Sequence, residues 1–202
     1  MIEPKRLILI RHAESSSNRD GILTGRASSS LTERGKHQSE KVAKYLMERF
    51  GATDGLYSSP LKRALETASI ISEKLSVPVL VDELLVEMDF GRWEGKTADE
   101  LTSEPEWSSY LKDPFHFHFP EGETPQMVKR RMEIFKEKLV SKKNWKTIIV
   151  VSHYTPIVFL ILGVLNYNNA SRSPFYIENA SISIIQIAGK SSCIELLNYT
   201  PY

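Results

Sequence analysis

The stretch TIIVVS, from Thr147 to Ser152, constrains the fold more than any other part of the sequence. It is a continuous apolar run rather than an alternation of polar and apolar residues, and a strand of this kind is covered on both of its faces. Such strands occur in parallel sheets that carry helices on each side. The sequence therefore predicts an α/β protein in which this stretch forms the most buried strand.

Other short strands alternate with amphipathic helices along the chain, as a mainly parallel sheet requires. The predicted architecture is a three-layer α/β/α fold. The expected strands are Leu7–Arg11, Gly55–Ser58, Val77–Val81 and Thr147–Ser152, followed by a closing hairpin of Ala180–Ala188 and Ser192–Leu197 around Gly189-Lys190. The expected helices start at Thr32, at Ser59-Pro60, at Thr97 with the capping box TADE, at Thr124-Pro125 and at Thr155-Pro156.

The size and charge of the chain limit what it can be. Its 202 residues are expected to form one domain, with a lid-like segment at about residues 95–124. The 26 basic and 25 acidic residues nearly balance, which argues against a nucleic-acid-binding protein. The longest apolar stretch, Ile157 to Leu165, is too short to span a bilayer, so no membrane partner is expected. The single cysteine, Cys193, cannot form an internal disulfide, and a cytoplasmic protein is expected.

Residues suited to phosphate chemistry follow the expected strands. Arg11 and His12 follow the first strand, and Arg63 lies one turn into the helix after the second. Glu87 comes after the third strand, and His153 directly follows the apolar run. Because ligands bind beyond the carboxyl ends of parallel strands, these side chains should meet in one crevice. Arginines match phosphate oxygens, an imidazole attacks phosphorus, and a carboxylic acid protonates the leaving oxygen.

The pair Arg11-His12 also poses a geometric requirement. Taken alone, such a pair after a strand is usually a solvated strand end. The hypothesis of a phosphate site therefore depends on Arg11 and His12 meeting the other strand-end residues in one crevice. Simple strand alternation would point the two side chains to opposite faces of the sheet. The chain is therefore expected to twist or bulge out of regular strand geometry at this point.

Five segments of the sequence, in order, resemble the motifs of the histidine phosphatase superfamily, which includes phosphoglycerate mutases and fructose-2,6-bisphosphatases. They are LIRHAES, SSPLKRALETA, EMDFGRWEG, PEGET and VVSHYTPI. The resemblance covers most of the chain, and it implies a phosphoglycerate mutase-like fold.

The resemblance also implies roles for individual residues. It makes His12 the nucleophile that becomes phosphohistidine, and Glu87 the general acid and base. Arg11 and Arg63 match the phosphate-binding arginines, and His153 matches a second histidine that binds the phosphoryl group as a cation. Four further positions match residues near the phosphate or the substrate: Asn18 at the phosphate, and Thr24, Gly25 and Glu123 at the pocket rim.

The sequence departs from the family pattern in ways that bear on the reaction. Tyr154 stands where glycine commonly follows the second histidine, so it is a rim candidate that either narrows the pocket or packs away from it. Met88 stands where mutases carry an arginine for their substrate, and no arginine pair lies between Glu87 and the PEGET motif. These absences favour a phosphatase over a mutase.

The segment FHFHF raises the question of a metal. Alternation would put His116 and His118 on one face, but two histidines are fewer than the three or four ligands of a zinc site. No metal is expected, because cationic side chains can carry the phosphoryl charge.

These observations together predict a metal-independent phosphomonoesterase that hydrolyses a small phosphorylated metabolite through a phosphohistidine, without a cofactor. One alternative is a phosphoglycerate mutase primed by 2,3-bisphosphoglycerate, and another is a non-catalytic module that binds phosphorylated ligands. A homodimer also stays open, since the closing hairpin could add strands at an interface.

Overall fold

The strand β4 (Thr147–Ser152) lies between two parallel partners in a six-stranded sheet of order β3-β2-β4-β1-β5-β6. The computed structural model describes residues 5–142, 144–167, 171–189 and 191–202. All six residues of β4 are buried, because helices cover both faces of the sheet. The predicted α/β/α architecture and its most buried strand are confirmed.

The other strands follow the predicted order closely. Parallel pairing joins β1 (Lys5–Arg11) to β4, β4 to β2 (Gly55–Ser58), and β2 to β3 (Val79–Val81). On the other side of β1, β5 (Ile182–Ala188) and β6 (Ser191–Tyr199) form the predicted antiparallel hairpin. Lys190, in the predicted turn of this hairpin, lies outside the described residues.

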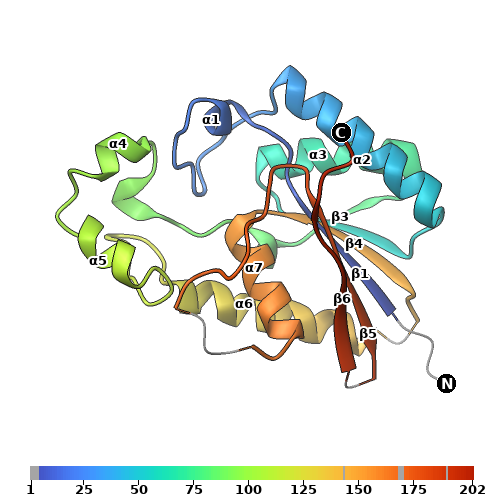
Figure 1. Cartoon of the computed structure of the whole chain (residues 1–202). Helices are drawn as coiled ribbons and strands as arrows, with labels where there is room; N and C mark the ends of the chain where they lie inside the picture. The colour runs from blue at the N-terminus through green and yellow to red at the C-terminus, as the bar shows by residue number, and fades with distance from the viewer. Residues whose placement is uncertain (1–4, 143, 168–170, 190) are drawn as a thin grey trace.

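Two helices cover each face of the sheet (Figure 1). On one face, α2 (Glu33–Phe50) and α3 (Lys62–Leu75) pack on Ile8 and Ile10 of β1. On the other face, α6 (Pro125–Ser141) and α7 (Tyr154–Val164) pack on Leu7 and Leu9 of the same strand. The alternation of β1 side chains between two cores explains why the strand is apolar from Leu7 to Ile10.

Smaller elements lie beyond the carboxyl ends of the parallel strands. They are α1 (Ser16–Arg19), the 3₁₀ helices η1 (Glu83–Leu85) and η2 (Gly91–Trp93), α4 (Ala98–Leu101) and α5 (Trp107–Lys112). The predicted capping box at Thr97 is present: its hydroxyl accepts from the Glu100 backbone N–H. The α4–α5 segment stands apart from the sheet in Figure 1, and Ile22 pairs with Thr97 to join it to the loop after α1. That this segment acts as a lid stays a prediction.

Several predicted boundaries are wrong by one to a few residues. Strand β1 begins at Lys5 rather than Leu7, β5 begins at Ile182 rather than Ala180, and β6 runs from Ser191 to Tyr199 rather than from Ser192 to Leu197. Helix α3 begins at Lys62 rather than at Pro60, with Leu61 as its N-cap, and the Ser59 hydroxyl both contacts His153 and accepts from the Leu61 N–H. Helix α7 has His153, not Thr155, as its N-cap. Strand β3 begins at Val79 rather than Val77, since the Val77 N–H still bonds to the Ser72 carbonyl at the end of α3.

No helix among the described residues has the length and apolar character needed to cross a membrane.

Candidate active site

His12 lies at the point where β1 leaves the sheet. The strand ends at Arg11, and the His12 N–H still donates to the Ser152 carbonyl across 2.8 Å. The Ala180 N–H then donates to the carbonyls of both Arg11 and His12, at 3.0 and 3.2 Å, so the regular ladder is broken here. As a result both side chains line the same cavity, as their expected convergence requires.

The hydrogen bonds of His12 determine its tautomer. Its Nδ1 lies 2.8 Å from the Ala13 carbonyl oxygen, which only accepts, so Nδ1 carries the proton. The lone pair is therefore on Nε2, which accepts from the Arg63 Nε–H at 3.1 Å. Burial, followed by the charges of Arg63 and Arg11, holds the pKa of His12 well below its ordinary value of 6.5. His12 is therefore a neutral imidazole with its lone pair directed at Arg63.

Arg63 is fixed by carbonyl groups from the loop after α1. Its Nη2 donates to the Gly25 carbonyl at 2.7 Å, and its Nη1 donates to the Ala27 carbonyl at 3.1 Å. Gly25 has a φ of +54°, and a Cβ there would collide with the Glu94 carboxylate. The predicted rim residue Gly25 lines the cavity, and its carbonyl also orients the buried guanidinium.

Arg11 lies at the other side of His12, next to Tyr154. Its Nη1 donates to the Ile177 carbonyl at 2.7 Å, and its guanidinium lies 5.7 Å from the centre of the Tyr154 ring. Within the described structure, the buried Arg11 Nε has no hydrogen-bond partner. Tyr154 lines the cavity rather than packing away from it, which answers the question left open by the sequence.

Asn18 also lines the cavity, and it is held by Asn179. The Asn179 Nδ2 group donates to Asn18 Oδ1 at 3.1 Å and to the His12 carbonyl at 3.0 Å. Because Asn18 Oδ1 also accepts from the Ser15 N–H, the amide nitrogen of Asn18 is the end left to face an anion. Thr24, another predicted rim residue, lines the same cavity.

His153 lies behind His12, with their ring centres 5.1 Å apart. Its Nε2 lies 2.8 Å from the Ser59 hydroxyl, and no described residue hydrogen-bonds its buried Nδ1. Burial, then the charge of Arg63 and the other groups nearby, lowers the pKa of His153 well below 6.5. Burial first, and then these neighbouring charges, therefore favour the neutral imidazole over the expected cation when no anion is bound. His153 also lies outside the set of residues that line the cavity.

Glu87 reaches the cavity from the segment between η1 and η2. One carboxylate oxygen accepts from the Met88 N–H at 2.7 Å, and the other accepts from the Thr155 N–H in the first turn of α7 at 3.5 Å. Glu87 is only 7% exposed. Its carboxyl group is therefore positioned on the cavity wall by two backbone donors.

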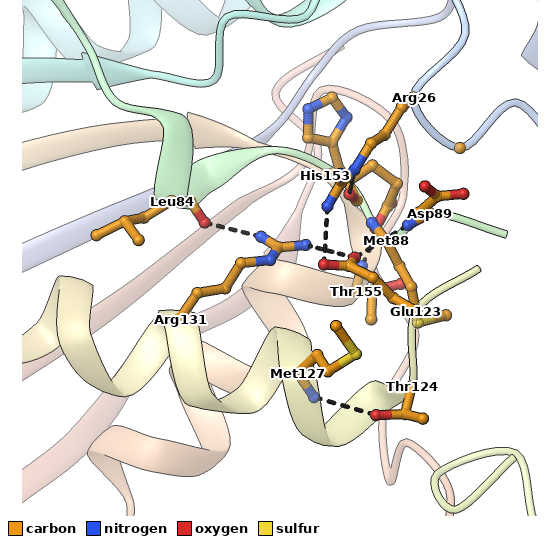
Figure 2. Close-up of polar contacts among 12 residues, drawn as sticks. Arg26, Leu84, Met88, Asp89, Glu123, Thr124, Met127, Arg131, His153 and Thr155 are labelled. Carbon is orange, nitrogen blue, oxygen red and sulfur yellow. Dashed lines mark hydrogen bonds and ion pairs between the residues drawn. The ribbon is translucent and has the colours of Figure 1, made fainter. Parts of the chain in front are cut away.

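Glu123 does not line the cavity, contrary to its expected place at the rim. Its carboxylate pairs with Arg26 at 2.7 Å and with Arg131 at 3.5 Å, and it also accepts from the Asp89 N–H at 3.0 Å. The cations on either side draw the side chain away from the cavity and into an ion-pair network (Figure 2).

The same network braces the segment that carries Glu87. Arg131, on α6, donates to the Leu84 carbonyl at 2.7 Å, and Figure 2 shows its guanidinium between that carbonyl and Glu123. Arg26 donates to the Glu87 carbonyl at 3.4 Å. Leu84 and Glu87 are thus tied to Glu123 through arginines, and Asp89 is tied to it directly.

The site opens into a cavity of 450 Å³. Arg11, His12, Arg63, Glu87 and Asn18 line one end of it. Most of the other lining side chains are aromatic or aliphatic, and they come from the loop after α1, η2, the α4–α5 segment, α7 and the segment before β5. The cavity therefore has two parts. One binds an anion next to the nucleophile His12, and the other is a largely apolar chamber.

The FHFHF segment turns its phenylalanines inward and its histidines outward. Phe117 and Phe119 are buried, whereas His116 and His118 are exposed, and His116 Nδ1 lies 2.9 Å from Asp113. Within the described part of the chain, His, Cys, Asp and Glu residues form no group of three or more that could hold a metal ion.

Several residues that support this site were not predicted from the sequence. They are Ser59, which contacts His153; Asn179, which holds Asn18; Thr67, whose hydroxyl accepts from the Ala13 N–H; and the arginines Arg26 and Arg131. Ser59 and Thr67 lie inside the motif SSPLKRALETA, so proximity in sequence was the one available signal.

Comparisons with known proteins agree with this geometry. The sequence model of the Histidine phosphatase superfamily (branch 1) matches residues 7–200. The chain is 34% identical over 198 residues to Phosphoserine phosphatase 1 of Hydrogenobacter thermophilus, with 96% of this chain and 92% of that protein covered. It is 31% identical over 195 residues to the adenosylcobalamin/alpha-ribazole phosphatase of Escherichia coli, with 96% and 95% covered. The solved alpha-ribazole phosphatase of Shigella flexneri superposes with a TM-score of 0.87, at 30% identity and with 96% of each chain covered.

Proposed function

The chain belongs to branch 1 of the histidine phosphatase superfamily, and on that basis we propose that His12 Nε2 attacks the phosphorus of a small phosphate ester. The observation that carries this proposal is the pair of hydrogen bonds on His12. The Ala13 carbonyl holds the proton on Nδ1, which leaves the lone pair on Nε2 beside Arg63. A neutral imidazole in this tautomer is the form that acts as a nucleophile.

The chain is a phosphoric monoester hydrolase, as predicted from its sequence. Its relatives at 34% and 31% identity are both named phosphatases, and so is the solved structure with a TM-score of 0.87. The mutase alternative is not favoured.

In the first step, the His12 Nε2 lone pair forms a bond to phosphorus while the bond from phosphorus to the ester oxygen breaks. Glu87, in its protonated form, donates its proton to that leaving oxygen, and an alcohol departs. The Arg63 Nε–H, which occupies the His12 lone pair in the free protein, is then free to donate to a phosphoryl oxygen. Arg11 and the Asn18 amide, which line the same cavity, supply further donors.

In the second step, water attacks the phosphohistidine. The Glu87 carboxylate accepts a proton from the water as the new bond to phosphorus forms and the bond to His12 Nε2 breaks. Inorganic phosphate leaves, and His12 returns to its neutral form. Burial and the charges of Arg63 and Arg11 lower the His153 pKa, and a phosphoryl anion beside His153 offsets the arginine charges, so binding of the anion favours protonation of His153.

The proposal requires neither a metal ion nor a bisphosphoglycerate primer. Arg11 and Arg63 already supply the positive charge that a developing phosphoryl transition state needs. We expect phosphate release to continue in EDTA and without a primer. Loss of activity in EDTA, restored by added Mg²⁺ or Zn²⁺, would contradict this part of the proposal. The single thiol, the exposed Cys193, supports a reducing compartment such as the cytoplasm.

The test of the mechanism is the phosphoenzyme. The native protein should form an acid-labile, base-stable phosphoryl adduct, and His12→Ala should form none and release no phosphate. His116→Ala is the matched control, because His116 is exposed and outside the cavity. Full phosphatase activity in His12→Ala would overturn the proposal. Glu87→Gln should slow an alkyl phosphate by about 10²–10⁴-fold and an activated aryl phosphate far less.

A further inference from the structure

Charge is confined to one end of the cavity. Of the described residues that line it, the charged or readily protonated ones are Arg11, His12, Arg63 and Glu87. All four belong to the proposed phosphate chemistry, so the part of the cavity that receives the alcohol has no lining cation or carboxylate of its own.

Four cations lie close to this part of the chain, and each is held by acidic side chains or by a backbone carbonyl. Arg26 pairs with Glu123, Arg92 pairs with Glu104 and Glu106, and Lys96 also pairs with Glu104. Arg172 donates to the Leu111 carbonyl on the lid-like segment. These four side chains lie outside the set that lines the cavity.

The chamber that receives the alcohol is aromatic. Its lining side chains include Leu23, Phe90, Trp107, Tyr110, Phe115, Phe119, Val158 and Phe159. The Trp107 and Tyr110 rings lie 5.5 Å apart, and Phe115 lies 4.9 Å from Phe159 across the gap between the lid-like segment and α7. Trp107, Tyr110 and Phe115 are only partly buried, so ring surface is left for a ligand to cover.

We propose that this chamber binds an uncharged aromatic ring, and that the substrate is the phosphate monoester of an alcohol carrying such a ring. The inference rests on the proposed function, because the phosphate must occupy the His12 end. A volume of 450 Å³ lies within the range of about 300–1,000 Å³ typical of pockets for whole small molecules rather than for phosphate alone. Aromatic walls favour stacked or edge-to-face contacts with a further ring.

The same chamber disfavours an alcohol that carries a carboxylate. A carboxylate that leaves water needs a cation or several hydrogen-bond donors, and without them its transfer is costly. Phosphoserine has a carboxylate and an ammonium group close to its phosphate. Although a relative at 34% identity is named a phosphoserine phosphatase, we infer that phosphoserine is a poor substrate here.

A series of esters with similar leaving groups tests the proposal: ethyl phosphate, 2-phenylethyl phosphate and O-phospho-L-serine. We expect kcat/KM for 2-phenylethyl phosphate to exceed that for ethyl phosphate by at least about tenfold, since even one methylene in an apolar pocket is worth about tenfold or more. Phosphoserine should fall below 2-phenylethyl phosphate by at least as much. Equal or better hydrolysis of phosphoserine would overturn the inference.

Two variants on α5 test whether this chamber causes the preference for 2-phenylethyl phosphate over ethyl phosphate. Trp107→Ala should lower the ratio of kcat/KM between 2-phenylethyl and ethyl phosphate at least about fivefold, and Trp107→Phe should restore much of it. Leu111→Ala is the control on the same helix, because Leu111 is 51% exposed and outside the cavity lining. An unchanged ratio in Trp107→Ala would overturn the assignment of the chamber. The proposed function fails in a different way, namely if no ester is hydrolysed or if hydrolysis survives in His12→Ala.

Discussion

Arg63 Nε donates a hydrogen bond to His12 Nε2 across 3.1 Å, so the guanidinium directly contacts the lone pair that attacks phosphorus. This contact keeps a cation next to the imidazole and helps to lower its pKa. It also places a donor where a phosphoryl oxygen must arrive. One side chain therefore keeps the nucleophile neutral before the reaction and stabilises negative charge during it.

Replacing Arg63 by methionine separates these two effects. We expect Arg63→Met to lower kcat/KM by about 10²–10³-fold, as for the loss of a donor at a developing oxyanion. Because the positive charge also lowers the His12 pKa, the acidic limb of the kcat/KM profile should move to higher pH. The measurement is kcat/KM against pH for an aryl phosphate. Arg130→Met is the control, since the Arg130 side chain is 78% exposed on α6, and its profile should match the native one.

The two buried histidines predict how stability depends on pH. The pKa values of His12 and His153 lie below 6.5 in the folded protein, largely through burial, whereas both residues titrate near 6.5 in the unfolded chain. Below about pH 6.5 the unfolded chain therefore binds more protons, and the free energy of unfolding decreases as the pH falls. Each histidine contributes up to about 1.4 kcal/mol per pH unit in this window and nothing above it.

Urea unfolding at pH 7.5 and pH 5.5 measures this dependence. In His153→Asn, the loss of stability between the two pH values should be smaller than in the native protein. Asparagine is also a good N-cap for α7, the position that His153 occupies. His116→Asn should behave like the native protein, because His116 is exposed. Identical pH dependence in His153→Asn and the native protein would show that His153 is not held neutral.

Topology explains why the sequence predicted most of this site. Arg11, His12, Arg63 and His153 lie at or just after the ends of parallel strands, and parallel strands end at one edge of a sheet. The prediction needed only the order of strands and helices, which hydrophobic periodicity indicates. Several acidic residues lie near Glu87 in the sequence, and each was a candidate for the general acid. The motif EMDFGRWEG identified Glu87 among them.

The residues that the sequence did not reveal depend on the path of the chain in three dimensions. Asn179 reaches Asn18 because the segment before β5 returns along β1, and no local pattern indicates that contact. The neutral state of His153 depends on its burial beside two arginines. Glu123 was correctly placed near the site, but the direction of its side chain is set by Arg26 and Arg131, which are distant in sequence.

The position of Glu123 leads to a prediction about stability and proton transfer. Glu123→Gln removes the negative charge between Arg26 and Arg131, and leaves the Arg131 guanidinium, 11% exposed, without its ion pair. We expect the free energy of unfolding to decrease by roughly 2 kcal/mol, the typical scale for a hydrogen bond to a charged group. Because the network holds the Glu87 segment, kcat should fall more for an alkyl phosphate than for an activated aryl phosphate.

Glu121→Gln is the control for this variant, since Glu121 is exposed and lies two residues away. It should leave the unfolding transition and both rates unchanged. Thermal unfolding and the ratio of alkyl to aryl phosphate turnover check the prediction. If Glu123→Gln kept native stability and the native ratio, Glu123 would not be positioning the Glu87 segment.

Tyr154 yields a prediction about substrate size. It lines the cavity, and its ring lies beside Arg11 and 6.1 Å from the ring of Tyr176. Its hydroxyl lies 3.5 Å from the Phe175 carbonyl, so the side chain links α7 to the segment before β5 at the cavity wall. Removing it enlarges the space next to the phosphate-binding end while leaving His12 and Glu87 in place.

We therefore expect Tyr154→Gly to broaden activity towards bulkier phosphate esters. The ratio of kcat/KM for a naphthyl-substituted alkyl phosphate to that for ethyl phosphate should rise several-fold. The substitution loses the packing of a partly buried side chain and adds about 1 kcal/mol or less for glycine near a helix start, so thermal unfolding must show that the variant is folded. Tyr167→Gly is the control, because Tyr167 is 51% exposed and lines no part of this cavity. A size profile of Tyr154→Gly that matches the native protein would mean that Tyr154 does not limit the size of the substrate.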